Sequence, residues 1–246
     1  MEKFWKVKAI DHTMGEIQIY GEITSYKWDE SDTTAKSFKE DLDRLGDIKT
    51  LNIYMNSPGG SVYEGNAIYN ILKRHKAKIN IHIDGIAASI ASVIAMAGDT
   101  IFMPENTMMM IHNPWTFAMG NASDLRKEAD DLDKAQESMM ISYLAKAGEK
   151  LEKDKLIRML DAETWLSAKE CVEYGLCDVI EQEKNIAASF NRDFFAKYKN
   201  TPKNLLEIAN KTTDSDISDE EKQVRQQLKE EAEVSIQKLN LILGGM

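Results

Sequence analysis

Ser89 stands where two contrasting segments meet. The alternating apolar and polar residues of Ile79–Asp84 are typical of a strand, Gly85 permits a sharp turn, and small apolar residues follow the serine. A serine at such a strand-to-helix turn has an exposed hydroxyl. Its own amide and its neighbours' amides are unpaired first-turn donors, which suit a developing oxyanion. This is the logic of a hydrolase nucleophile elbow without the full G-x-S-x-G pattern. Taken alone, the segment is explained more simply by a helix N-cap serine.

His112 is the histidine best placed for proton transfer. It ends the apolar run Met108–Ile111 and precedes Asn113-Pro114, which puts an imidazole at a strand terminus, where a general base could act. A turn histidine without a catalytic role is the alternative. The other histidines lie in a polar N-terminal stretch, at an exposed helix end and within an alternating strand, at positions His12, His75 and His82.

A cluster of turn-forming residues, Asn56-Ser57-Pro58-Gly59-Gly60, follows another short apolar strand. Its two glycines let backbone amides approach a ligand closely and could supply a further donor to an oxyanion, although a tight turn explains them too. No Lys and Ser/Thr pair follows the glycines, which disfavours a phosphate loop for nucleotides.

A serine and histidine that act together need an acid that orients the imidazole. The candidates are Asp161 and Glu163, which would face the same side of an extended segment. Both also fit surface acids, since the capping box Ser167-Ala168-Lys169-Glu170 that follows them begins a helix.

An alternation of strands and helices carries these residues. Strand patterns cover Glu16–Ile23, Leu51–Met55, Ile79–Asp84, Thr100–Met103, Met108–Ile111 and Asp178–Glu181. Helical patterns cover Asp32–Leu45, Val62–Lys73, Ala88–Ala97, Asn121–Ala147, Asp154–Leu160 and Ser167–Gly175. This order predicts an α/β fold with a mostly parallel sheet covered by helices.

The longest of these helices begins at Asn121 or Ser123 and ends at Gly148. Apart from one apolar stripe it is highly charged. Such a helix projects from a domain or packs at a subunit contact more readily than it enters a core. The stripe consists of Leu125, Leu132, Met139 and Tyr143.

Composition and charge narrow the range of possible functions further. The chain has 246 residues and a net charge of −10, so it lacks the basic face that nucleic acids require and we expect no such partner. Cys171 and Cys177 show no metal-binding spacing and fit packing residues in a reducing compartment. The longest apolar stretch, Ile86–Ala97, is shorter than the ~20 residues that span a bilayer, and no targeting segment is visible. We therefore expect a cytoplasmic protein without membrane contact.

Four blocks of sequence occur in a characteristic order: Asn56–Val62, Gly85–Ser89, Met110–Pro114 and Trp165–Asp178. Together they closely resemble the ClpP family of serine peptidases, over Glu16–Ile180, about two thirds of the chain. The resemblance implies the ClpP/crotonase fold, with repeated β-β-α units and a projecting handle helix. It also implies hydrolysis of peptide bonds without a cofactor or metal.

Position by position, the resemblance implies Ser89 as the nucleophile and His112 as the base. The backbone amides of Gly59, Gly60 and Ile90 match the oxyanion hole of the family.

The acid of the triad departs from the family's usual pattern. That acid is usually an Asp two residues before the aromatic of an aromatic-Leu-Ser block, and here Glu163 holds this place before Trp165. Glu is one methylene longer, so its backbone must lie farther from His112. Asp161, two residues earlier, is the competitor.

The resemblance also implies partners. Proteins of this type act on protein and peptide substrates and assemble into rings of seven, which can stack in pairs through the helix that begins at Asn121. The N-terminal block and the Glu163–Leu166 segment look more like the ClpP-like head maturation (prohead) proteases of tailed phages and prophages. This suggests capsid or scaffold proteins as substrates, in the host cytoplasm or the prohead. It weakens the expectation of an unfoldase ATPase partner.

The pattern changes beyond Glu183. We expect a ClpP-like peptidase domain over residues 1–183, a weakly patterned segment and linker over 184–218, and an acidic amphipathic helix over 219–246. That helix fits a coiled-coil arm, a tail that binds capsid or portal protein, or a solvated helix.

Two other functions share the expected fold. An acyl-CoA hydratase or isomerase of the crotonase type uses oxyanion amides with carboxylates and needs no serine nucleophile, so the pairing of Ser89 with His112 argues against it. A catalytically latent, ring-forming scaffold would not need an intact serine, histidine and acid.

Overall fold

The computed structural model describes residues 3–25, 33–182, 198–203 and 205. The described residues up to 182, together with 198–201, belong to one compact unit. The helix expected over 219–246 and most of the segment expected over 184–218 lie outside the described residues.

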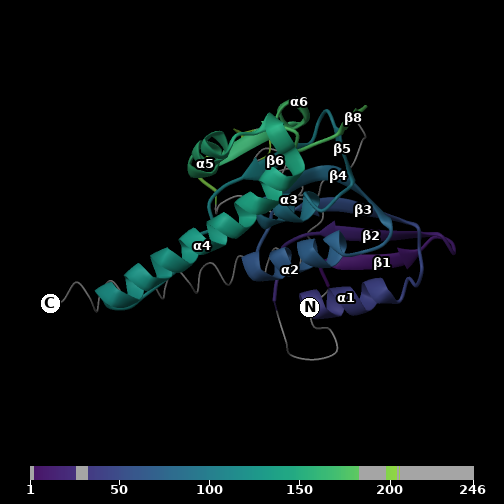
Figure 1. The fold of residues 1–246 in the computed structure, drawn as a ribbon, viewed down its shortest axis with the longest axis horizontal. Coiled ribbons are helices and arrows are strands. Elements are labelled where there is room, and N and C mark those ends of the chain that lie inside the picture. Colours follow the sequence, from purple (N-terminus) through teal and green to yellow (C-terminus); the bar gives the residue numbers. More distant parts are fainter. Residues whose placement is uncertain (1–2, 26–32, 183–197, 204, 206–246) are drawn as a thin grey trace, which may run out of the picture. The chain divides into compact units, whose positions relative to one another are not determined.

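Eight strands form a single mixed sheet (Figure 1). They are β1 (Trp5–Ala9), β2 (Met14–Tyr20), β3 (Thr50–Ser57), β4 (Lys78–Ala88), β5 (Thr100–Pro104), β6 (Met108–Ile111), β7 (Thr164–Ser167) and β8 (Val179–Glu181). Their order is β1-β2-β3-β4-β5-β8, with β6 beside β4 and β7 beside β6. The pairs β1–β2 and β6–β7 are antiparallel and the others are parallel. The predicted α/β fold with a mostly parallel sheet is confirmed.

Helices connect most of these strands. They are α1 (Ala35–Asp43), α2 (Val62–Lys73), α3 (Ile90–Ala95), α4 (Ala122–Ala147), α5 (Lys153–Asp161) and α6 (Ala168–Glu173), with a short 3₁₀ turn, η1 (Gly148–Lys150). A row of isoleucines crosses the sheet from β2 to β5 in matched register and is fully buried, which places the core between sheet and helices. The row consists of Ile17, Ile53, Ile81 and Ile101.

The central strand β4 runs three residues beyond the glycine that was expected to end it. Residues Asn80–His82 pair with β5, whereas Ile86–Ala88 pair with β6. Gly85 therefore lies where the strand changes neighbours, and the ladder continues on a new partner instead of ending. The register between β3 and β4 also shifts here, between Met55 and Ser57. The expectation of a strand break at Gly85 was wrong for this reason.

The long helix α4 is anchored at one end only. Asn121, one of the two N-caps that the sequence offers, caps it through a capping box with Asp124. Its buried residues all lie in its second half, from Met139 to Ala147, whereas Leu125 in the first turns is exposed. Figure 1 shows the first half running away from the sheet, which agrees with the expected projecting helix. Across the described part of the chain, no helix combines the length and apolar character that crossing a membrane requires.

Candidate active site

Ser89 occupies a strained turn directly after β4. Its φ of 54° lies in the left-handed region, which a residue with a side chain rarely adopts and which is common at functional sites. The Ser89 amide donates to the carbonyl of Met110 in β6 at 2.9 Å. The expectation that this amide is an unpaired first-turn donor was therefore wrong, because it continues the hydrogen bonding between β4 and β6. The serine caps nothing with its side chain, which leaves the hydroxyl available.

His112 lies next to Ser89 because their strands run in parallel and end together. Ala88 pairs with Met110, so the residues that follow the two strands meet at one edge of the sheet. The His112 Nε2 and Ser89 Oγ atoms are 2.7 Å apart, and both residues are buried, with 7% and 8% of their surfaces exposed. Burial lowers the pKa of His112, and the Glu163 carboxylate acts in the opposite direction. A neutral imidazole at this distance can accept the serine proton.

The glycine turn after β3 contacts the serine directly. A Cβ atom at Gly59 would lie 2.6 Å from the Ser89 Cβ and 3.2 Å from its Oγ, and Gly59 has a φ of 97°. No side chain fits there, so glycine is required for the close approach. The amide of Gly59 donates to Ser57 Oγ at 3.2 Å in this structure.

The neighbouring amide, that of Gly60, points the other way. Ile23 donates to the carbonyl of Gly59 at 2.7 Å and accepts from the amide of Ser61 at 2.8 Å, in a parallel bridge. In that pattern the intervening residue directs its own N–H away from the partner strand. The Gly60 amide therefore faces the side of β4, on which Ser89 lies.

Helix α3, which follows Ser89, is fixed by a buried hydroxyl chain. Ser92 Oγ donates to the carbonyl of Ser89 at 2.5 Å and lies 2.6 Å from the hydroxyl of Tyr143 in α4. This chain ties the turn that carries the serine to the anchored half of α4. The first residue of α3 is Ile90, whose amide belongs to the unpaired first turn.

Asp161 is bonded away from the serine and histidine. It ends α5, and its carboxylate accepts a hydrogen bond from the Asn113 side chain at 2.8 Å. The Asn113 side chain in turn accepts one from Gln136 of α4 at 2.5 Å. Asp161 and Gln136 therefore fix the side chain of Asn113, the residue after His112, between α5 and α4.

Glu163 is bonded to a distant part of the chain. Its φ of 48° ends the extended course that the sequence reasoning considered for residues 161–163. Its carboxylate accepts hydrogen bonds from the amides of Lys199 at 3.0 Å and Asn200 at 2.7 Å. Among the residues that the structure describes, neither this carboxylate nor that of Asp161 is hydrogen-bonded to the His112 ring.

Tyr198 covers the serine and histidine. Its ring stands edge-on to His112, with centroids 5.4 Å apart, and to Trp165 at 6.2 Å. Its hydroxyl donates to the carbonyl of Pro58, the residue before the two glycines. Burial raises the pKa of Tyr198 to about 12, against the opposing effect of a hydrogen bond with Ser89. Sequence reasoning missed this residue, because it lies in a weakly patterned segment with no motif.

The family model of the Clp protease matches residues 16–184. The chain belongs to the Clp protease family. It is 36% identical over 149 residues to an ATP-dependent Clp protease proteolytic subunit of Porphyromonas gingivalis, covering 58% of this chain and 64% of the relative. It is 34% identical over 146 residues to the subunit of Pleurastrum terricola, covering 58% and 73%. For proteolytic subunit 1 of Salinibacter ruber the identity is 33% over 153 residues, covering 60% and 63%.

Each aligned region covers only part of this chain and only part of the relative. The chain spans just under two thirds of the length of the Porphyromonas and Salinibacter relatives. The Clp protease match ends at residue 184, so Tyr198 and the amides bound by Glu163 lie beyond it.

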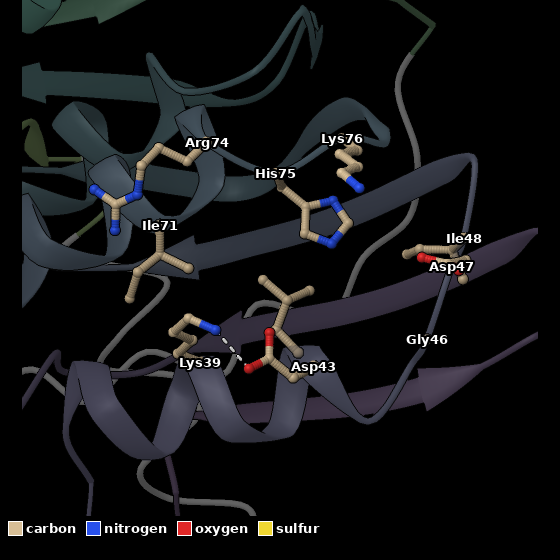
Figure 2. Close-up of a pocket in the computed structure, with 10 residues that line it drawn as sticks. Lys39, Asp43, Gly46, Asp47, Ile48, Ile71, Arg74, His75 and Lys76 are labelled. Atoms are coloured by element: carbon tan, nitrogen blue, oxygen red, sulfur yellow. Dashed lines mark hydrogen bonds and ion pairs between the residues drawn. The ribbon is translucent and has the colours of Figure 1, made fainter.

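A separate cavity lies away from this site, at the C-terminal ends of α1 and α2 (Figure 2). It has a volume of about 430 Å³ and is lined by charges of both signs, among them Lys39, Asp43 and Arg74. Lys39 and Asp43 form an ion pair at 2.5 Å, and burial lowers the pKa of His75. None of the residues expected to be catalytic lines it. Within the described ranges, no three His, Cys, Asp or Glu side chains are grouped so as to hold a metal ion.

Proposed function

We propose that this member of the Clp protease family is a serine peptidase in which Ser89 is the nucleophile and His112 the general base. The 2.7 Å contact between His112 Nε2 and Ser89 Oγ carries the proposal, because it joins a hydroxyl on a strained turn to a histidine of lowered pKa. The names of the three relatives, each a Clp protease proteolytic subunit, support it.

The proposed reaction follows from these positions. His112 takes the proton of Ser89, and Oγ attacks the carbonyl carbon of the scissile peptide bond. We assign the stabilisation of the oxyanion to the amides of Gly60 and Ile90, which Gly59 joins if its amide leaves Ser57 Oγ. The imidazolium then protonates the leaving amine, which gives an acyl-enzyme that water hydrolyses. Loss of one oxyanion donor in such a site costs roughly 3 kcal/mol of barrier.

We propose Glu163 as the acid that orients His112, with Asp161 as the alternative. The electrostatic effect of Glu163 on the pKa of His112 supports this choice. Asp161 is instead engaged by the side chain of Asn113.

The decisive experiment is covalent labelling of the full chain with a fluorophosphonate, followed by peptide mass mapping. We expect one adduct, on Ser89, that is absent from Ser89→Ala. Circular dichroism of Ser89→Ala should match that of the wild type. No adduct on Ser89 in the wild type or in Tyr198→Ala would contradict the proposal and favour a latent scaffold.

We further propose a ring of seven subunits, singly or in stacked pairs, with contacts through α4. Large apolar side chains are exposed on the approach to this helix and along it, which supports a subunit contact there. They are Trp115, Phe117, Met119, Leu125 and Ile141. Native mass spectrometry should give a mass of seven or fourteen chains, and a monomer would contradict this assembly.

The natural substrates that we propose are capsid or scaffold proteins of a phage prohead. The likeness of the Glu163–Leu166 segment to prohead proteases supports this choice. Incubation with purified phage capsid and scaffold proteins should give discrete fragments that are absent with Ser89→Ala. Cleavage of unrelated unfolded proteins at the same rate would contradict a dedicated role.

A further inference from the structure

We propose that residues Tyr198–Asn200 form an internal strap that binds across the Ser89–His112 pair and must leave before a peptide can reach it. The strap is held at a site for polypeptide backbone formed by Glu163 and the carbonyl of Ala162. This inference rests on the proposed peptidase function.

The first observation is the anchor of the strap. The Glu163 carboxylate accepts hydrogen bonds from two successive main-chain amides, those of Lys199 and Asn200, at 3.0 and 2.7 Å. The Asn200 side chain donates to the carbonyl of Ala162 at 2.8 Å. Hydrogen bonds to a charged acceptor are about twice as strong as neutral ones, so the carboxylate is the main attachment.

The second observation is the position of Tyr198. Its ring packs edge-on to His112, and its hydroxyl bonds to the carbonyl of Pro58 and interacts with Ser89. A scissile carbonyl must come within about 3–3.5 Å of Ser89 Oγ, on the side of the oxyanion amides. The Tyr198 hydroxyl bonds to the carbonyl of Pro58, directly before the glycine turn that is proposed to supply those amides, so it lies on that side. The strap and a reacting peptide therefore exclude one another.

The strap is not placed for cleavage of its own backbone. The group that meets Ser89 is a phenol, which contains no acyl carbon that a serine could attack. The burial of Ser89 and His112, with 8% and 7% of their surfaces exposed, fits a covered site.

The anchor also indicates what can displace the strap. Glu163 binds main-chain amides, a feature that any extended polypeptide shares. A protein substrate can therefore compete for the same carboxylate while it takes the place of Tyr198. A small ester or a fluorophosphonate lacks these amides and reaches Ser89 only when the strap opens unaided.

The test measures the rate of fluorophosphonate labelling of Ser89 in the full chain. Tyr198→Ala removes the ring and the hydroxyl. We expect labelling to accelerate roughly tenfold or more, because the closed strap loses the stabilisation of one hydrogen bond and of one aromatic contact. Tyr198→Phe keeps the ring and should give a smaller increase. Asn200→Ala, which loses the bond to Ala162, should also accelerate labelling.

The matched control is Tyr63→Ala, since Tyr63 lies on α2 with 77% of its surface exposed. It should label at the wild-type rate. Equal or slower labelling of Tyr198→Ala and Asn200→Ala, with Ser89 still reactive in the wild type, would overturn the strap and leave the peptidase proposal intact.

A second measurement does not depend on catalysis. Hydrogen–deuterium exchange of the full chain should show protection of the Lys199 and Asn200 amides in the wild type. Glu163→Gln should lose that protection, whereas Glu149→Gln, at an exposed position, should keep it. Fast exchange at both amides in the wild type would overturn the strap. Protection without labelling in any variant would instead reject the peptidase proposal.

Discussion

The Glu163 carboxylate accepts a hydrogen bond of 2.7 Å from the amide of Asn200, which lies 37 positions later in the chain. Glu163, which we propose to orient His112, therefore holds the strap through both of its carboxylate oxygens. Each carboxylate oxygen keeps a further lone pair, but the two amides fix the direction of the carboxylate, and in the described structure neither oxygen is hydrogen-bonded to the His112 ring. Release of the strap would both uncover Ser89 and free the acid.

The identity of the acid is best tested once the strap is gone. In a Tyr198→Ala background, adding Glu163→Gln should slow labelling of Ser89 by a factor on the order of 10⁴, the loss found when the acid of a triad is replaced by its amide. The physical reason is that Gln cannot stabilise the imidazolium that forms as Ser89 attacks. Adding Asp161→Asn to the same background should change the rate far less.

The reverse ranking would assign the acid to Asp161. A double variant with Glu163→Gln that labels as fast as Tyr198→Ala would remove Glu163 from the triad. Thermal denaturation of each variant would show whether a slow rate reflects a loss of folded protein.

The pH dependence of labelling should report His112. Burial places the pKa of His112 below the ordinary value of 6.5, so the rate should fall on acidification with a midpoint below 6.5. The labelling rate falls on acidification because protonation removes the Nε2 lone pair that accepts the serine proton. In Tyr198→Ala the ring is less buried, and the midpoint should move up towards 6.5.

A rate profile of the wild type with a midpoint above 6.5 would show that the Glu163 charge outweighs burial. A midpoint unchanged by Tyr198→Ala would show that the tyrosine does not cover the imidazole. Tyr63→Ala gives the baseline for both comparisons.

Gly59→Ala should damage the site more than a backbone change alone explains. The new Cβ would meet the Ser89 Cβ at 2.6 Å and the carbonyl of Ala88 at 2.8 Å, at a φ of +97°. Gly46→Ala is the matched control, since Gly46 also has a positive φ, +70°, but nothing lies within 4 Å of its Cβ position. The control should lose about 1–2 kcal/mol of unfolding free energy and label normally.

Urea denaturation and labelling of the two variants separate these effects. Gly59→Ala should lose further stability and most of its labelling. If the two glycine variants behave alike, the close approach of the turn to Ser89 is not required.

Tyr143→Phe should loosen the link between α3 and α4. The hydroxyl of Tyr143 is buried and lies 2.6 Å from Ser92 Oγ, so its removal should cost about 1 kcal/mol of unfolding free energy. Tyr63→Phe, at an exposed position, should cost nothing measurable. A loss below the error of urea denaturation would show that Ser92 is satisfied by the carbonyl of Ser89 alone.

Local patterns in the sequence predicted elements whose signals are local. The helix Val62–Lys73 and the strand Met108–Ile111 have the predicted bounds, because apolar periodicity and flanking breakers define them. The capping box at Ser167 was likewise predicted, since it consists of two side chains three residues apart, and Asn121 is one of the two N-caps expected for the long helix. Ser89 and His112 were paired through the family resemblance, because neither segment shows by itself that the other lies beside it.

Features that depend on distant partners were missed. Strand β7, Thr164–Ser167, forms because it pairs antiparallel with the edge of β6. Its four residues are too few for a strand pattern to be recognised in the sequence. Strand β1 likewise lay in a stretch without a predicted element and pairs with β2. Tyr198 has a role only because the chain returns to Glu163, which no spacing within its own segment encodes.

The antiparallel pairing of β6 with β7 has a consequence for how this architecture can vary. Met110 and Trp165 face each other across that ladder, although α4, η1 and α5 all lie between them in the chain. That long excursion leaves the edge of the sheet and returns to the same edge. Its exposed outer half can lengthen, shorten or acquire new surface without displacing the chemistry beneath it. Descendants of one peptidase could thus evolve different assemblies by remodelling a single hairpin-like insertion.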